Sequence, residues 1–164
     1  MIRSHRAIRL LASLTVLAAA SVAGADESTH VMLTPPDIQW GDAPPVLPPG
    51  AKLAVLYGDP GKTALFILRL KLPNGYKVPA HSHPADENVT VLSGSFSMGM
   101  GEKFDAAKMK AYGPGSFLVM PATSHHYAMT RGETIVEVAG MGPFGITYAN
   151  PADDPSKHVA SAKP

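Results

Sequence analysis

Between residues 51 and 148 the sequence alternates short apolar runs with turn residues, and this alternation limits the folds open to the chain. Ala51–Tyr57 and Thr63–Leu72 are each followed by a turn rich in Gly, Pro, Asp or Asn. The later apolar runs are Glu87–Leu92, Ser95–Met100, Gly115–Met120, His126–Met129, Thr134–Ala139 and Phe144–Tyr148. Several short strands with turn residues between them are typical of a β-sandwich or β-barrel. Only Phe104–Ala111 has the composition of one or two helical turns, so the chain is predicted to be all-β.

Length and composition agree with one globular domain. The 164 residues are enough to bury a hydrophobic core, and 45% of them are apolar, which excludes a disordered or fibrous chain. Only 16% are charged and the formal net charge is +1, without the basic patch of a nucleic-acid-binding protein, so we expect no nucleic-acid partner. The chain has no Cys, which excludes a disulfide, a thiolate metal site and a Cys nucleophile.

Residues 1–25 have the three parts of a secretory signal peptide. Three arginines among the first nine residues give a basic start, and residues 10–20 are apolar but too short to span a bilayer. Ala23-Gly24-Ala25 matches the small-residue cleavage pattern. The alternative is an uncleaved membrane anchor. We expect cleavage after this tripeptide, a periplasmic or secreted mature protein, and no stable membrane insertion afterwards.

The segments on either side of the predicted barrel domain, residues 51–148, differ from it in composition. Residues 26–50 contain six prolines. Proline fixes φ and removes a backbone donor, so this segment is predicted to be an extended N-terminal arm, anchored on the domain by Trp40. Residues 149–164 are polar and contain three prolines, and they are predicted to form a flexible C-terminal tail.

Candidate metal ligands gather between Gly75 and Gly94. His81 and His83 are two residues apart, so in a strand both imidazoles point to the same face. Glu87 follows across a short turn, and its carboxylate can return to the same point. Imidazole and carboxylate ligands together suit one divalent ion of Fe, Mn, Ni, Cu or Zn better than Ca or Mg.

A third imidazole is expected from the adjacent pair His125 and His126, which follows a turn at Pro121. Neighbouring residues of a strand point to opposite faces, so only one of the two can reach the metal.

The spacing of residues 75–94 resembles the first motif of the cupin superfamily, G-(x)5-H-x-H-(x)3-E-(x)6-G, at every position. Residues 115–126 resemble the second motif, G-(x)5-P-x-G-x-x-H, except that Thr123 replaces its Gly; Thr130 also replaces the usual final Asn. Thr adopts positive φ less easily than Gly. The resemblance covers roughly residues 50–148. It implies a jelly-roll (double-stranded β-helix) cupin barrel, and it implies four metal ligands: His81, His83, Glu87 and His126.

Fold alone does not name the reaction, since cupins include dioxygenases, decarboxylases, isomerases, lyases, sensors and storage proteins. The first hypothesis is a metal-dependent, oxygenase-like enzyme acting on a small organic substrate, with Glu87 as ligand, base or both in turn. The alternative is a non-catalytic periplasmic protein that binds a metal or small ligand for sensing or scavenging. The sequence leaves open the metal, the substrate and a homodimer. It also leaves open the directions of Tyr76, Tyr127 and Arg69.

Overall fold

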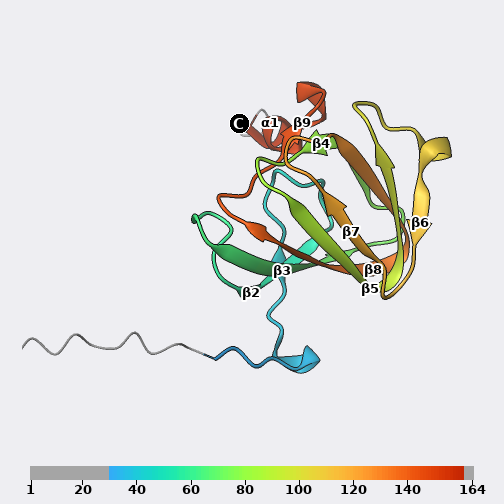
Figure 1. Ribbon diagram of the computed structural model, residues 1–164. Helices are drawn as coiled ribbons and strands as arrows, with labels where there is room; N and C mark the ends of the chain where they lie inside the picture. The colour runs from blue at the N-terminus through green and yellow to red at the C-terminus, as the bar shows by residue number, and fades with distance from the viewer. Residues whose placement is uncertain (1–29, 161–164) are drawn as a thin grey trace, which may run out of the picture. The chain divides into compact units, whose positions relative to one another are not determined.

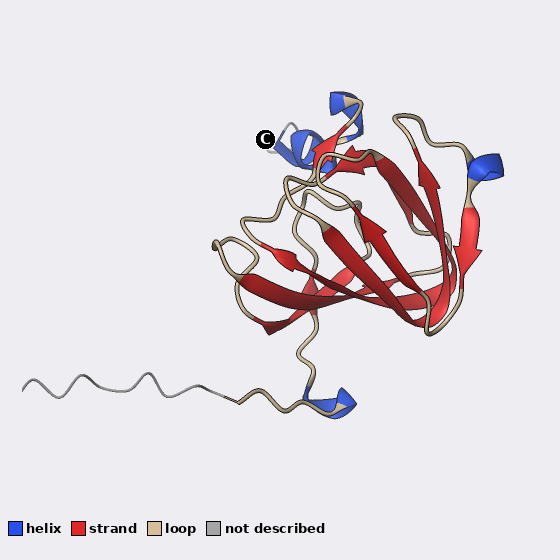
Figure 2. Ribbon diagram, viewed as in Figure 1, coloured by secondary structure: helices blue, strands red, loops and turns tan. Residues whose placement is uncertain are grey.

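The computed structural model of the protein describes residues 30–160, and these form one curled antiparallel β-sheet with short helical turns (Figure 1). The predicted signal peptide, residues 1–25, lies outside the described residues. The strands are β1 (Gly41–Asp42), β2 (Lys52–Tyr57), β3 (Leu65–Leu72), β4 (Lys77–Ser82), β5 (Glu87–Met100), β6 (Lys110–Tyr112), β7 (Phe117–Met120), β8 (His126–Met141) and β9 (Thr147–Tyr148). The helical elements are η1 (Pro35–Asp37), η2 (Ala106–Lys108), η3 (Pro151–Asp153) and α1 (Pro155–Ala160). The all-β prediction is confirmed, and Figure 2 shows the helical turns at the margins of the sheet.

Strand β8 organises the barrel. It pairs with β3 and β4 along one edge and with β5 along the other, always antiparallel. One path through the sheet has the strand order β1-β2-β3-β8-β4-β9. Strands β6 and β7 lie off this path, and both pair with β5. Because β8 pairs with other strands along both of its edges, the strands on its two sides curl around a common interior.

Strands β5 and β8 are each continuous where the sequence predicts two shorter strands. Ser93-Gly94 separates two of the predicted strands, and in the structure it forms a β-bulge instead of a turn, with register shifts on both sides of Ser93. Gly94 has a φ of 78°, and a Cβ there would collide with the carbonyl oxygen of Glu133 in β8. A glycine with positive φ inside a strand bends it without ending the pairing, and local sequence does not distinguish such a bulge from a turn.

The interior is apolar and follows the period-2 alternation of the strands. In β3, Phe66, Leu68 and Leu72 are buried, and in β8, Val136 and Val138 are buried while the residues between them are partly exposed. On the opposite face of the same strands, the Arg69 Nε atom lies 2.9 Å from Glu137 Oε2, so Arg69 points away from the barrel interior. This cross-strand pair is more than a quarter exposed and adds little to stability.

The segment just before β2 closes one side of the barrel, and we call residues 43–50 the strap. The Tyr76 hydroxyl donates a hydrogen bond to Pro48 O, and the Tyr148 hydroxyl donates to Val46 O at 2.7 Å. Just before the strap, the Trp40 ring lies under Lys71 Nζ of β3, 4.6 Å from the ring centroid. Two barrel tyrosines therefore hold the strap, through the carbonyl groups of its residues 46 and 48.

Among residues 30–160, none of the helical segments is both long enough and apolar enough to cross a lipid bilayer.

Candidate metal centre

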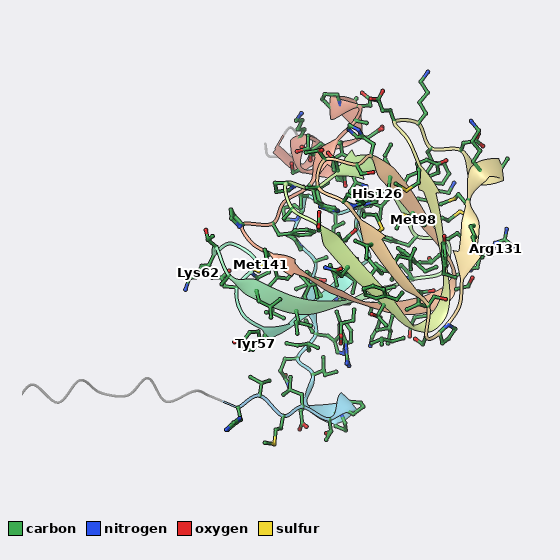
Figure 3. The ribbon with its side chains drawn as sticks, viewed as in Figure 1. Tyr57, Lys62, Met98, His126, Arg131 and Met141 are labelled. Carbon is green, nitrogen blue, oxygen red and sulfur yellow. The ribbon has the colours of Figure 1, made fainter. Side chains whose placement is uncertain are left out.

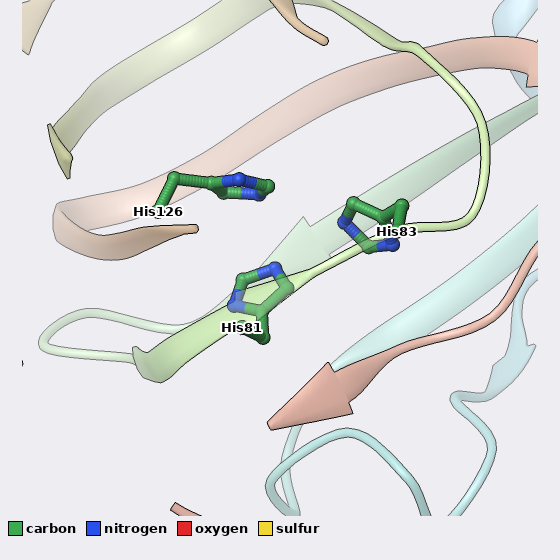
Figure 4. A group of neighbouring side chains, drawn as sticks. All are labelled: His81, His83 and His126. Atoms are coloured by element: carbon green, nitrogen blue, oxygen red, sulfur yellow. The ribbon is translucent and has the colours of Figure 1, made fainter. Parts of the chain in front are cut away.

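Four potential ligands converge inside the barrel from three strands. His81 lies in β4, His83 directly after it, Glu87 at the start of β5, and His126 at the start of β8. His81 and His126 are register partners across β4 and β8. All four are buried, and one ligand atom from each histidine lies within 4.8 Å of the others (Figure 4). The three histidines thus form a cluster that can hold a metal ion.

Hydrogen bonds to backbone carbonyls set the orientation of each imidazole. His81 Nδ1 lies 2.7 Å from Pro79 O, His83 Nδ1 2.7 Å from Gly145 O, and His126 Nδ1 3.0 Å from Ser124 O. A carbonyl oxygen only accepts, so each Nδ1 carries the proton and each Nε2 keeps its lone pair for a metal or a second proton. This is the arrangement usual for metal-ligating histidines.

Two of these lone pairs have no partner within the described residues. The Nε2 atoms of His83 and His126 are buried without a hydrogen bond, although Glu87 Oε2 lies 3.5 Å and 3.3 Å from them. A buried polar atom without a partner is costly, and such atoms are rare in folded proteins. A cation placed between imidazole nitrogens and a carboxylate satisfies both, so the residues present fit a metal ion.

The electrostatics of the cluster favour the metal-binding protonation states. Burial, followed by the proximity of His126 and His83, lowers the pKa of His81 to about 3. Burial by itself raises the pKa of Glu87, but the neighbouring imidazoles of His126 and His83, whose Nε2 atoms can share a second proton with the carboxylate, outweigh it and hold that pKa at about 2. At neutral pH His81 is therefore neutral and Glu87 is ionised, as metal ligation requires.

The turn before β8 has Thr123 where the second cupin motif has Gly, but its backbone still adopts the positive φ that a Gly allows. Thr123 has a φ of 64°, the only positive φ at a non-glycine residue within 30–160. This conformation costs roughly 1–2 kcal/mol. The turn is fastened to the loop of the first motif, because Thr123 N donates to His83 O and Ala122 N donates to Asp86 Oδ1, both at 2.8 Å. These bonds compensate for the missing glycine and position Ser124 O under His126.

The segment after β8 contributes to the cluster, although the sequence assigns it no role. The Phe144 ring stacks on His83 at 4.3 Å between centroids and packs against Phe66 at 4.9 Å. The neighbouring Gly145 O accepts the hydrogen bond of His83 Nδ1. This segment fixes the ring of His83 from a position 62 residues away in the sequence, and no local pattern announces that contact.

His126, and not its neighbour, belongs to the cluster. The His125 side chain is only partly buried, and its carbonyl oxygen accepts a bond from Gly101 N at 2.8 Å. Tyr127 is also directed away from the cluster: its ring lies 5.2 Å from Phe104, and its hydroxyl donates to Asp105 O. The motif spacing therefore predicts the same inward face of this strand that the structure shows. The metal-ligand roles themselves stay predictions.

The cluster lies at the wall of a cavity of about 280 Å³. Figure 3 shows His126 and Met98, both cavity-lining residues, within the barrel, whereas Tyr57, Lys62 and Arg131 project from it. Tyr76 also lines the cavity, and burial raises the pKa of its hydroxyl above the ordinary value. Tyr76 therefore points inward, which the sequence left open.

Comparisons with known proteins place the chain in a family and a fold. Residues 16–146 match the family described as "Domain of unknown function (DUF4437)". None of the curated proteins matches the sequence significantly.

Several solved structures are similar in fold. The polyketide cyclase RemF from Streptomyces resistomycificus has a TM-score of 0.60 at 15% identity, over 80% of this chain and 94% of that one. An RmlC-like cupin from Shewanella frigidimarina NCIMB 400 has a TM-score of 0.54 at 14% identity, over 69% and 91%. The DMSP lyase DddQ from Ruegeria pomeroyi DSS-3 has a TM-score of 0.53 at 21% identity, over 68% and 60%. The chain therefore belongs to the DUF4437 family and has the cupin fold.

Proposed function

We propose that this protein is an exported metal-dependent enzyme that acts on a small organic substrate inside the barrel. The observation that carries the proposal is the pair of unpartnered, buried Nε2 atoms beside the Glu87 carboxylate at the wall of the cavity. His81, His83, His126 and Glu87 would hold the ion, and imidazole with carboxylate suits Fe, Mn, Ni, Cu or Zn. When bound, such an ion supplies Lewis acidity or a template for O₂ and substrate.

The chain's own residues would supply proton handling, orientation and exclusion of water. Glu87 is ionised at neutral pH and is available as a ligand, as a base towards a substrate proton, or as both in turn. The apolar walls exclude water and strengthen electrostatic interactions at the cluster. We propose an oxygenase-like reaction, because this ligand set suits the redox-active ions Fe, Mn and Cu. The names of the similar cyclase and lyase indicate that this fold accommodates enzymes.

A second candidate function is non-catalytic binding of a metal or small ligand, for sensing or scavenging. One observation favours it. Among the described cavity-lining residues outside the four-residue cluster, only Tyr76 carries a hydroxyl or charged side chain, and its hydroxyl is already bonded to Pro48 O. If Glu87 is permanently a ligand, the cavity offers few other groups to transfer a proton.

Glu87→Gln separates the two functions. Protein loaded separately with Fe, Mn, Ni, Cu and Zn is screened for O₂ consumption and product formation with small phenols, diketones and organic acids. Turnover by the active form should fall by about 100-fold or more in Glu87→Gln, which is the scale of general acid–base catalysis. Thermal unfolding of the apoprotein should still be cooperative, because the apolar barrel core is intact. Glu133→Gln, at an exposed position of β8, is the matched control and should keep full activity. Failure of every metal form to turn over any substrate would favour the binding protein.

Export has its own test. We expect the mature protein to begin at Asp26, because the small residues Ala23 and Ala25 fit the signal peptidase. Mass spectrometry of the intact protein from the periplasmic fraction measures this directly. Replacing both alanines by leucine should block processing and leave the leader attached. Periplasmic protein that retains Met1 in the unsubstituted chain would contradict the proposal.

A further inference from the structure

The polar groups of the cavity are gathered mainly at one place. Of the 23 residues that line it, those with hydroxyl, imidazole or carboxylate groups are Tyr76, His81, His83, Glu87 and His126. No Lys, Arg, Asp, Asn, Gln, Ser or Thr is among these described lining residues. Four of the five polar side chains belong to the metal-binding cluster. Tyr76 precedes β4 and His81 lies near its end, so the tyrosine backbone is separated from the cluster by roughly 15 Å of strand.

The remaining wall is hydrocarbon. The side chains of Leu68 and Leu70 come from β3, Val89 comes from β5, and Val136 and Val138 come from β8. None of these can accept or donate a hydrogen bond. A polar ligand group placed against this wall would lose its hydrogen bonds to water without replacement, which weakens binding. Apolar ligand surface placed there is removed from water, which strengthens binding.

The strap completes the wall without adding polar side chains. Pro44, Val46 and Leu47 line the cavity. The carbonyl oxygen of Val46 is occupied by the Tyr148 hydroxyl, and the Tyr148 ring lies 6.0 Å from that of His81. The strap therefore approaches the metal-binding end and presents hydrocarbon to it.

We propose that the cavity takes a small, largely hydrocarbon molecule with one oxygen-bearing group at a single end. The oxygen group lies at the His81, His83 and His126 cluster, and the hydrocarbon body lies against β3, β8 and the strap. The ligand must fit a cavity of about 280 Å³, which is just below the volume typical of pockets that bind drug-sized ligands. Sugars, amino acids, nucleotides and polyanions are excluded, because their additional polar groups would have no partners. This inference rests on the proposed function, since a metal at the cluster is the partner for the oxygen group.

Two hydroxamates test the inference, because they share a metal-binding head and differ in the tail. Benzohydroxamate has an apolar ring and glycine hydroxamate has a cationic amine. Full-length mature protein is loaded with zinc, its metal content is measured, and each probe is titrated by calorimetry. Benzohydroxamate should bind at least about ten-fold more tightly than glycine hydroxamate, given the cost of burying an unpaired polar group.

Substitutions in β3 locate the effect in the cavity. Leu70→Gln should weaken benzohydroxamate binding about ten-fold and leave the zinc content unchanged. Ile67→Gln, on the outer face of the same strand, is the matched control and should bind benzohydroxamate like the unsubstituted protein. Val138→Thr keeps the branched shape of the side chain but adds a hydroxyl to the cavity wall. It replaces Leu70→Gln if that variant does not fold, and it should weaken binding in the same direction.

The outcomes distinguish the two proposals. Protein that takes up no zinc overturns the proposed function. Zinc-loaded protein that binds glycine hydroxamate as tightly as benzohydroxamate, or binds neither, overturns the inference about the ligand. Equal weakening by Leu70→Gln and Ile67→Gln would also overturn it.

Discussion

Replacing His126 by alanine is expected to empty the metal site, whereas replacing the adjacent His125 is not. The His126 side chain is buried, is oriented through Ser124 O, and places Nε2 3.3 Å from Glu87 Oε2. Loss of an outer partner of a metal ligand already costs 10–100-fold in affinity, so loss of the ligand itself should cost more than about 100-fold. His125 lies outside the cluster, and His125→Ala should retain nearly stoichiometric metal.

Metal content after gel filtration in the presence of a weak chelator measures this difference. Thermal unfolding gives a second readout, because a metal at 100 times its Kd stabilises the folded state by about 2.7 kcal/mol. EDTA should therefore lower the melting temperature of the unsubstituted protein and of His125→Ala, and it should have little effect on His126→Ala. If His125→Ala is the variant that loses its metal, the inward and outward faces at the start of β8 must be exchanged.

Acidification is expected to destabilise the metal-free protein. The pKa of His81 is about 3 in the folded state, against an ordinary value of 6.5 that applies to the unfolded chain. Between these values the unfolded chain binds a proton that the folded protein does not bind, so the free energy of unfolding falls as pH decreases. The slope is about 1.4 kcal/mol per pH unit for one proton, which amounts to about 2 kcal/mol between pH 6.5 and 5.

Glu87 acts in the same direction at lower pH. Its pKa is about 2 in the folded protein against an ordinary 4.5, so its stabilising contribution is present above pH 4.5 and is lost as the pH falls towards 2. Urea unfolding of EDTA-treated protein from pH 7 to pH 4 measures the combined slope. His81→Gln removes one titrating group and should flatten the curve above pH 4.5. An identical pH dependence in both proteins would show that His81 does not titrate as described.

Local patterns in the sequence were sufficient for the class of fold and for naming four residues that the structure brings together. Alternating apolar runs and turn residues predicted an all-β domain because side chains of a strand alternate between faces, and this period is visible in the chain itself. The same geometry placed His81 and His83 on one face, and the motif spacing selected Glu87 and His126. The structure brings these four residues together.

Tertiary structure decided what depends on pairing between distant segments. A bulge at Gly94 and a turn have the same local composition, and only the partner strand β8 shows that β5 continues through it. The orientation of His83 depends on Gly145 and Phe144, which are brought to it by the fold.

The directions of Tyr76 and Arg69, one into the cavity and one outward, were likewise invisible in the sequence. The sequence also did not indicate that the strap is hydrogen-bonded to the hydroxyls of Tyr76 and Tyr148. The physical reason is the same in each case: alternation along a strand tells which residues share a face, but only the closure of the sheet determines which face is the interior.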